Sequence, residues 1–308
     1  MSIFVYNLED FNSIKNKGFE YNLDSSILDI IQTISNQVGS PEYIKTPNFV
    51  KSKKIINDEN WEKIIIKKPI NTTKTKQELC IESIRININK ITSKTYDNII
   101  LKIINDIENI ENDEINSDCD NRALFNKIGE IIFVIASTNI FYSNIYAKLY
   151  NDLMVKFSFM NYILNENFEK FSDMYKNIEY CDSNIDYDKY CEINKNNDKR
   201  RALCMFYVNL MKLQVITKES IIKLILDIQN NVNDRINIET NKPFIDELSE
   251  LIFILVTNSK SELSDQKQWD EISGNITSIC KMEQSINVGL TNKSIFKHMD
   301  ISDIISKN

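Results

Sequence analysis

Apolar residues recur at the spacing of an α-helix along most of this chain, and that pattern restricts its fold more than any other feature. Ile81, Ile84, Ile88 and Ile91, for example, follow one another at i, i+3, i+7 and i+10, which places them on one helix face. The 308 residues include only 5 glycines and 4 prolines, whereas sheet proteins and glycine-rich phosphate-binding folds need more turn residues. The apolar share of 42% is enough for a packed core. The sequence therefore predicts an all-α protein.

Ten helices are predicted after residue 74. Two lie between residues 75 and 108, and the others cover about residues 122–138, 143–157, 162–175, 199–214, 217–230, 243–256, 265–282 and 293–305. The polar segments Asn109–Asn121 and Tyr180–Asp198 are predicted to be loops. Consecutive helices form pairs that repeat roughly every 40–47 residues, which is the period of HEAT repeats. Because one pair cannot bury its apolar face alone, we predict a HEAT-like α-solenoid of about five antiparallel helix pairs over residues 75–308.

Residues 1–74 differ in composition from the rest. They contain three of the four prolines, and a lysine-rich strip runs from Lys51 to Lys76. We predict an extended N-terminal arm with short helical pieces there. The net charge of −7 argues against capture of nucleic acid by the whole protein, but a local basic strip can still contact phosphate. The candidate RNA contacts in this strip are Lys51, Lys53, Lys54, Lys67 and Lys68. The alternative is a solvated linker.

Two further cations, Arg200 and Arg201, are predicted near the start of a helix, where positive charge opposes the helix dipole. Such a placement is tolerated more readily when the charges serve a partner. Both arginines are therefore candidate RNA contacts.

Motifs for catalysis are missing. The chain has no G-x-x-x-x-G-K-S/T or G-x-G-x-x-G phosphate loop and no G-x-S-x-G nucleophile elbow. Its only histidine, His298, is interpreted as a surface residue and cannot form a multi-histidine metal site. The six cysteines show no C-x-x-C spacing, which argues against zinc and against a redox pair. The acidic cluster is interpreted as a solvated run in a loop; it comprises Glu108, Glu111, Asp113 and Glu114. We predict that the protein is not an enzyme and uses no cofactor, metal or small-molecule substrate.

The scattered cysteines indicate reduced thiols and so a reducing compartment. No segment has the pattern of a signal peptide, and the most apolar stretches, Ile128–Phe141 and Leu251–Val256, are too short or too polar to span a bilayer. We predict a soluble, cytoplasmic protein that does not bind membranes.

Three segments, in this order along the chain, resemble one protein family. Ile88–Thr92 is similar to the Leu-Asn-Lys-Leu-Thr segment that bridges the first two helices in the middle domain of translation initiation factor 4G. Ile145–Leu149 resembles that domain's Tyr-Ala helix. Arg200–Thr217 resembles a later helix, which begins with Arg-Arg-Ser-Leu and ends with Leu-Thr. Order and spacing agree from about Thr75 to the C-terminus.

The resemblance implies a crescent of HEAT pairs that clamps a DEAD-box helicase of the initiation factor 4A type and speeds its ATP cycle. It also implies two helicase contacts. Ile56 and Trp61 match an apolar residue and a tryptophan that precede the family's repeats. Lys293 and Phe296 match a basic residue and a phenylalanine near the end of the domain, although Ile295 stands where the family usually has an arginine. The alternative for Trp61 and Phe296 is packing against the protein's own helices.

The N-terminus resembles the motif through which the family binds the cap-binding protein, initiation factor 4E. That motif consists of a tyrosine, four residues, a leucine and an apolar residue. Here Tyr6, Phe11 and Ile14 would lie along one side of a helix that folds on binding. Phe11 replaces the leucine and Asn12 replaces the apolar residue, so the alternative is a chance match.

The resemblance therefore predicts a translation-initiation scaffold that joins a cap-binding protein on the arm to a DEAD-box helicase on the solenoid, with mRNA as a further candidate partner. One alternative keeps the fold but places the protein in mRNA decay, splicing or the regulation of poly(A)-binding protein. Another is an RNA-binding solenoid that acts without a helicase.

Overall fold

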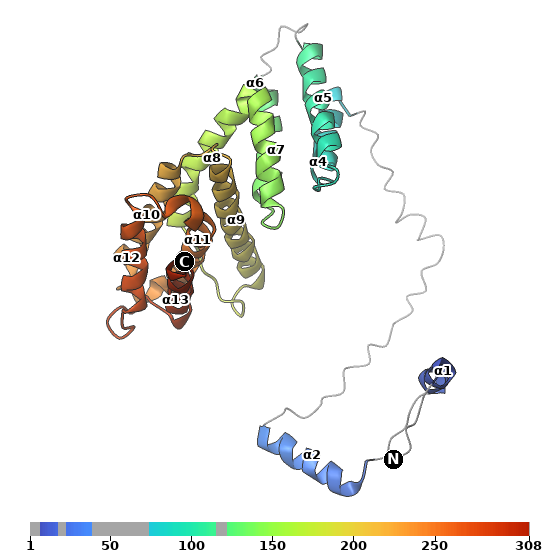
Figure 1. Ribbon diagram of the computed structural model, residues 1–308, viewed down its shortest axis with the longest axis vertical. Coiled ribbons are helices and arrows are strands. Elements are labelled where there is room, and N and C mark those ends of the chain that lie inside the picture. Colours follow the sequence, from blue (N-terminus) through green and yellow to red (C-terminus); the bar gives the residue numbers. More distant parts are fainter. Residues whose placement is uncertain (1–6, 18–22, 39–73, 115–121, 308) are drawn as a thin grey trace. The chain divides into compact units, whose positions relative to one another are not determined.

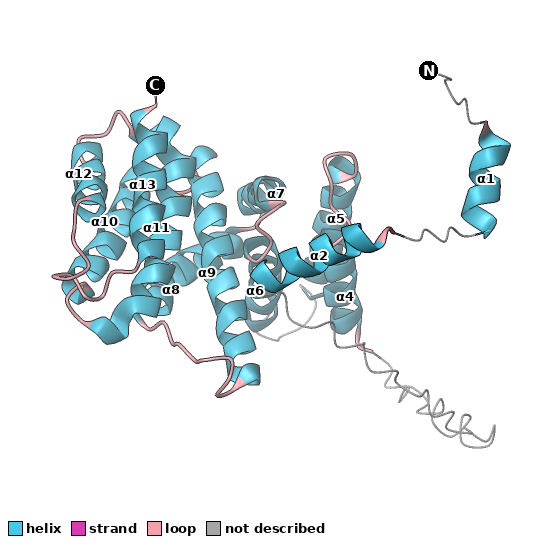
Figure 2. Cartoon of the chain, turned by 90° about the horizontal axis from the view of Figure 1, so that it is seen from below, coloured by secondary structure: helices cyan, strands magenta, loops and turns pink. Residues whose placement is uncertain are grey.

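The computed structural model describes residues 7–17, 23–38, 74–114 and 122–307 (Figure 1). The chain divides into two compact units, Met1–Asn71 and Thr72–Asn308, where the sequence placed the boundary after residue 74. All regular structure in the described ranges is helical, and no strand occurs in them (Figure 2). The prediction of an all-α protein is confirmed. Within the same ranges, no helix is both long and apolar enough to cross a membrane.

The first unit contains helices α1 (Leu8–Lys17) and α2 (Ser25–Val38). Asn7 caps α1, because its Oδ1 accepts hydrogen bonds from the backbone N–H groups of Glu9 and Asp10 at 2.8 and 2.9 Å. Asp10 reciprocates by accepting from the N–H of Asn7 at 3.0 Å. These bonds satisfy N–H groups that the first turn of a helix leaves without a partner. Residues 7–10 therefore determine locally where α1 begins.

The described part of the second unit contains ten α-helices and one short 3-10 turn. Each α-helix overlaps one of the ten that the sequence predicts. The helices are α4 (Lys76–Ile88), α5 (Tyr96–Glu114), α6 (Arg122–Ser137), α7 (Ser143–Lys156), α8 (Ser158–Lys176), α9 (Tyr187–Lys212), α10 (Lys218–Arg235), α11 (Lys242–Leu263), α12 (Trp269–Cys280) and α13 (Asn292–Ser306), and the turn is η1 (Glu239–Asn241).

The predicted acidic loop is partly helical, which corrects the sequence interpretation. Helix α5 continues to Glu114, so the carboxylates of the acidic cluster belong to its last turns. Glu108 forms an ion pair with Lys156 of α7, with Nζ and Oε1 2.6 Å apart. This ion pair connects α5 to α7, a role that a solvated loop would not have.

The predicted loop before α9 is also partly helical. Helix α9 begins at Tyr187, well before the predicted start at about Lys199. Asp186 caps it by accepting a hydrogen bond from the N–H of Lys189 at 2.9 Å. The first turns of α9 are mostly exposed and carry few apolar residues, so they show no apolar period. A helix that projects into solvent is not detectable by that signal.

The ten helices contact one another in two rows. In one row α4 contacts α6, α6 contacts α8, and α10 contacts α12. The hydroxyl of Tyr175 on α8 donates to a carboxylate oxygen of Asp227 on α10 at 2.6 Å and links the middle of this row. In the other row α7 contacts α9, α9 contacts α11, and α11 contacts α13, while Tyr96 on α5 donates to Asp152 on α7 at 2.7 Å. Hairpin neighbours such as α4 and α5 join the rows.

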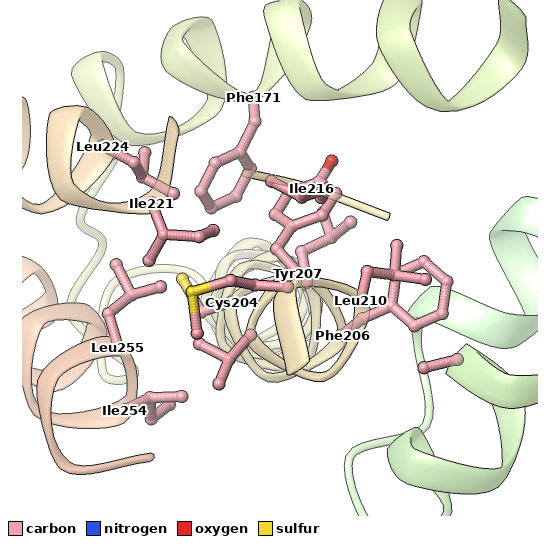
Figure 3. Packing of buried hydrophobic residues seen from close by; sticks show 14 of the residues in the cluster. Phe171, Cys204, Phe206, Tyr207, Leu210, Ile216, Ile221, Leu224, Ile254 and Leu255 are labelled. Carbon is pink, nitrogen blue, oxygen red and sulfur yellow. The ribbon is translucent and has the colours of Figure 1, made fainter. Parts of the chain in front are cut away.

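Helix α9 lies at the centre of the core, and Figure 3 views it nearly end-on. Phe206 points toward α6 and α7, where its ring meets those of Phe133 and Tyr150 edge to face at centroid distances of 5.9 and 5.7 Å. The next residue, Tyr207, meets the rings of Phe168 and Phe171 on α8 at 4.9 and 5.4 Å. Because these side chains point to different sides of one helix, α9 joins both rows into a single apolar core.

The loop before α13 is pinned to the end of α10. The backbone N–H of Gly289 donates to the carbonyl oxygen of Ile236 at 2.8 Å. A Cβ at this position would lie 2.7 Å from that oxygen, which is closer than real Cβ contacts. Glycine is therefore required for this approach. The contact holds the loop that leads into α13 against the end of α10.

Candidate partner-binding surfaces

Helix α13 exposes the aromatic residue that the sequence proposed as a helicase contact. Its start is set by Thr291, whose side chain accepts a hydrogen bond from the N–H of Ser294 at 3.1 Å. Phe296 is 61% exposed, and Met299, three residues further on, is exposed as well. Ile295 turns the other way and packs against the core. The alternative that Phe296 packs against the protein's own helices does not hold for the part of the chain that the structure describes.

Two lysines adjoin this aromatic residue and share one carboxylate. Lys293 Nζ lies 3.8 Å from Oε1 of Glu250, and Lys297 Nζ lies 3.1 Å from Oε2. Lys297 also lies over the ring of Phe253, 4.5 Å from its centroid, and so is held against α11. The contact of Lys293 is the longer one, and about half of its side chain is exposed. Lys293, Phe296 and Met299 follow at three-residue spacing on one helix face and are called the α13 surface below.

His298 is buried, which corrects the interpretation of this residue as a surface histidine. Its side chain is fully inaccessible on the inner side of α13. Nδ1 lies 2.8 Å from the carbonyl oxygen of Ser294 and is assigned as the donor to it, whereas Nε2 has no partner among the described residues. Burial lowers the pKa of His298 below its usual value of 6.5, because a charged ring would lose its hydration here.

Acidification is expected to destabilise the protein through His298. The folded state holds the proton less tightly than the unfolded chain. The stability given by the neutral ring is therefore complete above pH ~6.5 and is lost as the pH falls through the depressed folded-state pKa. Urea denaturation at about pH 8 and about pH 5 should show a smaller loss of stability in His298→Leu than in the wild type. The chain has one histidine, so the difference between the two proteins isolates this ring from the carboxylates. Equal losses in both proteins would contradict the assignment.

Arg200 and Arg201 do not lie near the start of a helix, as the sequence suggested, but in the middle of α9. Arg200 is only 5% exposed, and its guanidinium donates to the side-chain oxygen of Asn197. Burial lowers the pKa of Arg200. Since a buried guanidinium cannot reach a phosphate, we withdraw Arg200 as an RNA contact.

Arg201 forms a two-bond ion pair with Glu247 of α11. Its Nε donates to Oε1 of Glu247 at 3.0 Å and its Nη2 donates to Oε2. The side chain of Glu247 is 4% exposed, whereas that of Arg201 is about one third exposed. Burial raises the pKa of Glu247, and the contact with Arg201 opposes that rise. Arg201 therefore serves an internal pair, which leaves it poorly placed to bind RNA.

Two candidate contacts of the arm, Phe11 and Ile14, lie on helix α1, and Tyr6 lies outside the described residues. The part of the proposed motif from Leu8 onward forms a helix. Helix α2 adds a feature that the sequence interpretation missed. It exposes a row of aliphatic side chains, namely Ile27, Leu28, Ile30, Ile31 and Ile34. Their spacing on one helix face was the available signal.

The remaining candidate residues all fall in segment 39–73, outside the described residues. They are Ile56, Trp61, Lys51, Lys53, Lys54, Lys67 and Lys68. Their roles stay predictions.

Comparison of the chain with models of known protein families found no match, and comparison with curated proteins found no similar sequence. Among the described residues, no group of three or more histidine, cysteine or acidic side chains is arranged to hold a metal ion. The resemblance to initiation factor 4G therefore rests on the sequence segments alone.

Proposed function

We propose that this protein is a non-catalytic scaffold of translation initiation, which binds and activates a DEAD-box helicase of the initiation factor 4A type. The observation that supports the proposal most directly is the α13 surface. Its central residue, Phe296, matches a helicase contact in the sequence resemblance, and it is 61% exposed, whereas Ile295 and Ile301 of the same helix pack in the core. An exposed aromatic residue beside a half-exposed lysine suits a site where a partner docks.

We further propose that the ten helices of the second unit act as a HEAT-like α-solenoid. Contacts between alternate helices, which run α4 to α6 to α8 in one row and α7 to α9 to α11 in the other, support this arrangement. A solenoid offers an extended outer surface, so a two-lobed helicase could contact it at separate points.

The arm is proposed to bind a cap-binding protein of the initiation factor 4E type. The support is helix α1, which contains Phe11 and Ile14 of the motif, and the row of exposed aliphatic side chains on α2. Apolar helix faces without a covering partner are suited to docking in the groove of another protein. A cytoplasmic location belongs to this proposal, as does mRNA contact by the lysine strip.

Two alternatives share these observations. An adaptor in mRNA decay, splicing or poly(A)-binding regulation would use the same α13 surface for a different DEAD-box partner. An RNA-binding solenoid without a helicase would instead depend on the lysine strip, and its affinity for RNA would fall steeply with salt. Arg201 in an ion pair and Arg200 in the interior weaken the second alternative.

Phe296→Ala is expected to reduce stimulation of a factor-4A-type ATPase. Loss of a central aromatic contact should cost more than about 1 kcal/mol, or more than fivefold in the protein concentration needed for half-maximal stimulation. Trp61→Ala is expected to have a similar effect. Phe141→Ala is the matched control, because Phe141 is 90% exposed in the loop between α6 and α7. Unchanged stimulation by both Phe296→Ala and Trp61→Ala would refute the assigned interface.

Affinity purification with and without residues Met1–Thr72 tests whether the first unit binds the cap-binding protein and the second unit binds the helicase. The full chain should retain both a cap-binding protein and a helicase, and the shortened chain should retain the helicase alone. Loss of the helicase but not of the cap-binding protein would reverse the assignment.

A further inference from the structure

The loop before α9 and the first turn of that helix carry exposed aromatic side chains that none of the contacts proposed above uses. This part of the chain projects beyond the neighbouring helices (Figure 2). Tyr187 is 66% exposed, and the centroid of its ring lies 6.4 Å from that of Tyr190, with the two planes inclined by 30°. Tyr180 and Ile185 are exposed in the same segment. Exposed large side chains that gather in one place indicate an interaction surface.

Three carboxylates alternate with these side chains in the sequence, namely those of Asp182, Asp186 and Asp188. Asp182 accepts a hydrogen bond from the N–H of Asn184 at 2.8 Å, and Asp186 accepts from the N–H of Lys189 at 2.9 Å. These donors are neutral, so both groups keep their charge. None of the three carboxylates forms an ion pair with a described residue. We call the three carboxylates and the four exposed side chains together the α9 tip, and it comprises Tyr180, Asp182, Ile185, Asp186, Tyr187, Asp188 and Tyr190.

The α9 tip has three negative charges and no cation, and the residues around it do not reverse this sign. A hollow of about 330 Å³ beside it is balanced, because its charged lining residues are Glu179, Lys189, Glu192 and Arg200. At the end of α8, Lys176 pairs with Asp227 at 3.6 Å. The next exposed cation along α9 is Lys195, seven residues after Asp188, and counting it still leaves two net negative charges.

A segment rich in arginine complements both properties of the α9 tip. A guanidinium group binds a carboxylate through two parallel bonds, and it also stacks on the ring of a tyrosine. Lysine offers only a compact charge and stacks less well. A nucleic acid strand would be repelled by the three carboxylates, and an apolar helix would have to remove them from water. Since no group of three or more histidine, cysteine or acidic side chains in the described ranges is arranged for a metal ion, the carboxylates suit an organic cation better.

We propose that the α9 tip binds an arginine-rich segment of a partner protein. The guanidinium groups of this segment lie over the rings of Tyr187 and Tyr190 and bond to the carboxylates of Asp186 and Asp188. The site shares no residue with the α13 surface or with the arm, so it serves a partner in addition to the helicase and the cap-binding protein.

Selection of random 12-residue peptides displayed on phage, with the full chain as bait, tests the proposal. Counter-selection uses Asp186→Asn/Asp188→Asn, which removes two charges and keeps the shape, because asparagine can also cap a helix. Peptides retained by the wild type alone should contain several arginines. A synthetic peptide of the selected sequence should lose about fivefold in affinity on the double variant and about threefold on Tyr187→Ala, measured by fluorescence anisotropy. Lysine in place of its arginines should cost about threefold.

Matched controls come from other helices. Asp270 and Glu271 are exposed in the first turn of α12, and Tyr142 is exposed directly before α7. Asp270→Asn/Glu271→Gln and Tyr142→Ala should bind the peptide as the wild type does. Circular dichroism checks that every variant is folded. The proposal is overturned if no peptide is enriched, if the enriched peptides are apolar or acidic, or if the control variants lose affinity equally. Equal binding of the lysine and arginine peptides would overturn it as well, because the rings would then take no part.

Discussion

Replacing Phe206 by alanine is expected to lower the free energy of unfolding by about 4 kcal/mol, which is within the range for large aromatic residues in packed cores. The ring is fully buried on α9 and makes edge-to-face contacts with Phe133 and Tyr150. Its removal leaves a cavity between α9, α6 and α7 (Figure 3) and takes away both ring contacts. Urea denaturation followed by circular dichroism measures the loss.

Phe141→Ala provides the comparison, because that ring is 90% exposed and makes no core contact. Its effect should stay within about 0.5 kcal/mol. The same residue change is thus expected to cause a large loss of stability at the buried position and almost none at the exposed one. If both variants lost the same stability, the central position of α9 in the core would be wrong.

Removing Arg201 is expected to have the second largest effect, about 3 kcal/mol for Arg201→Ala near neutral pH. The change leaves the carboxylate of Glu247 buried without its two hydrogen bonds. Burial already raises the pKa of Glu247, and loss of the arginine raises it further. The protonated form is therefore favoured in the folded variant, and the loss of stability should shrink as the pH falls toward about 5.

A double variant distinguishes the loss of the ion pair from the cost of leaving the charge of Glu247 buried without a partner. Arg201→Met/Glu247→Leu removes both charges and should recover most of the stability, because two apolar side chains of similar size need no partner. Lys170→Ala is the control for an exposed pair. Lys170 and Glu166 form an ion pair at 2.8 Å in solvent on α8, and its loss should cost under about 0.5 kcal/mol. A double variant as unstable as Arg201→Ala would show that the ion pair itself, and not the buried charge, dominates.

Much of the secondary structure follows from the sequence because its signals are local. Each of the ten helices predicted after residue 74 corresponds to a helix of the second unit. Thr217, where the sequence predicts a helix to begin, caps α10 by accepting from the N–H of Ser220 at 3.2 Å. The prediction of a loop at Tyr180–Asp198 was partly wrong because the apolar periodicity that indicates a helix is absent at the start of α9. The first turns of α9 are mostly solvated and carry no apolar stripe, so helix and loop look alike there.

Whether a candidate site residue is exposed or buried was harder to predict from the sequence. The position of Phe296 was chosen from a resemblance, but the resemblance left open whether this ring packs inward or faces solvent. Only the packing of α13 on α11 decides that it is exposed. The aliphatic face of α2 could have been predicted from the spacing of its apolar residues, which is that of one helix face.

The sequence by itself thus determined that this protein is a chain of helices with few turn residues, and it marked where most helices begin. The tertiary structure alone decided which polar residues lie inside. His298 and Arg200 are buried and Arg201 is paired because helices distant in the chain meet there; Arg201 and Glu247, for example, are 46 residues apart. Helical periodicity is set within a few turns, whereas burial and charge pairing depend on neighbours that only the folded chain brings together.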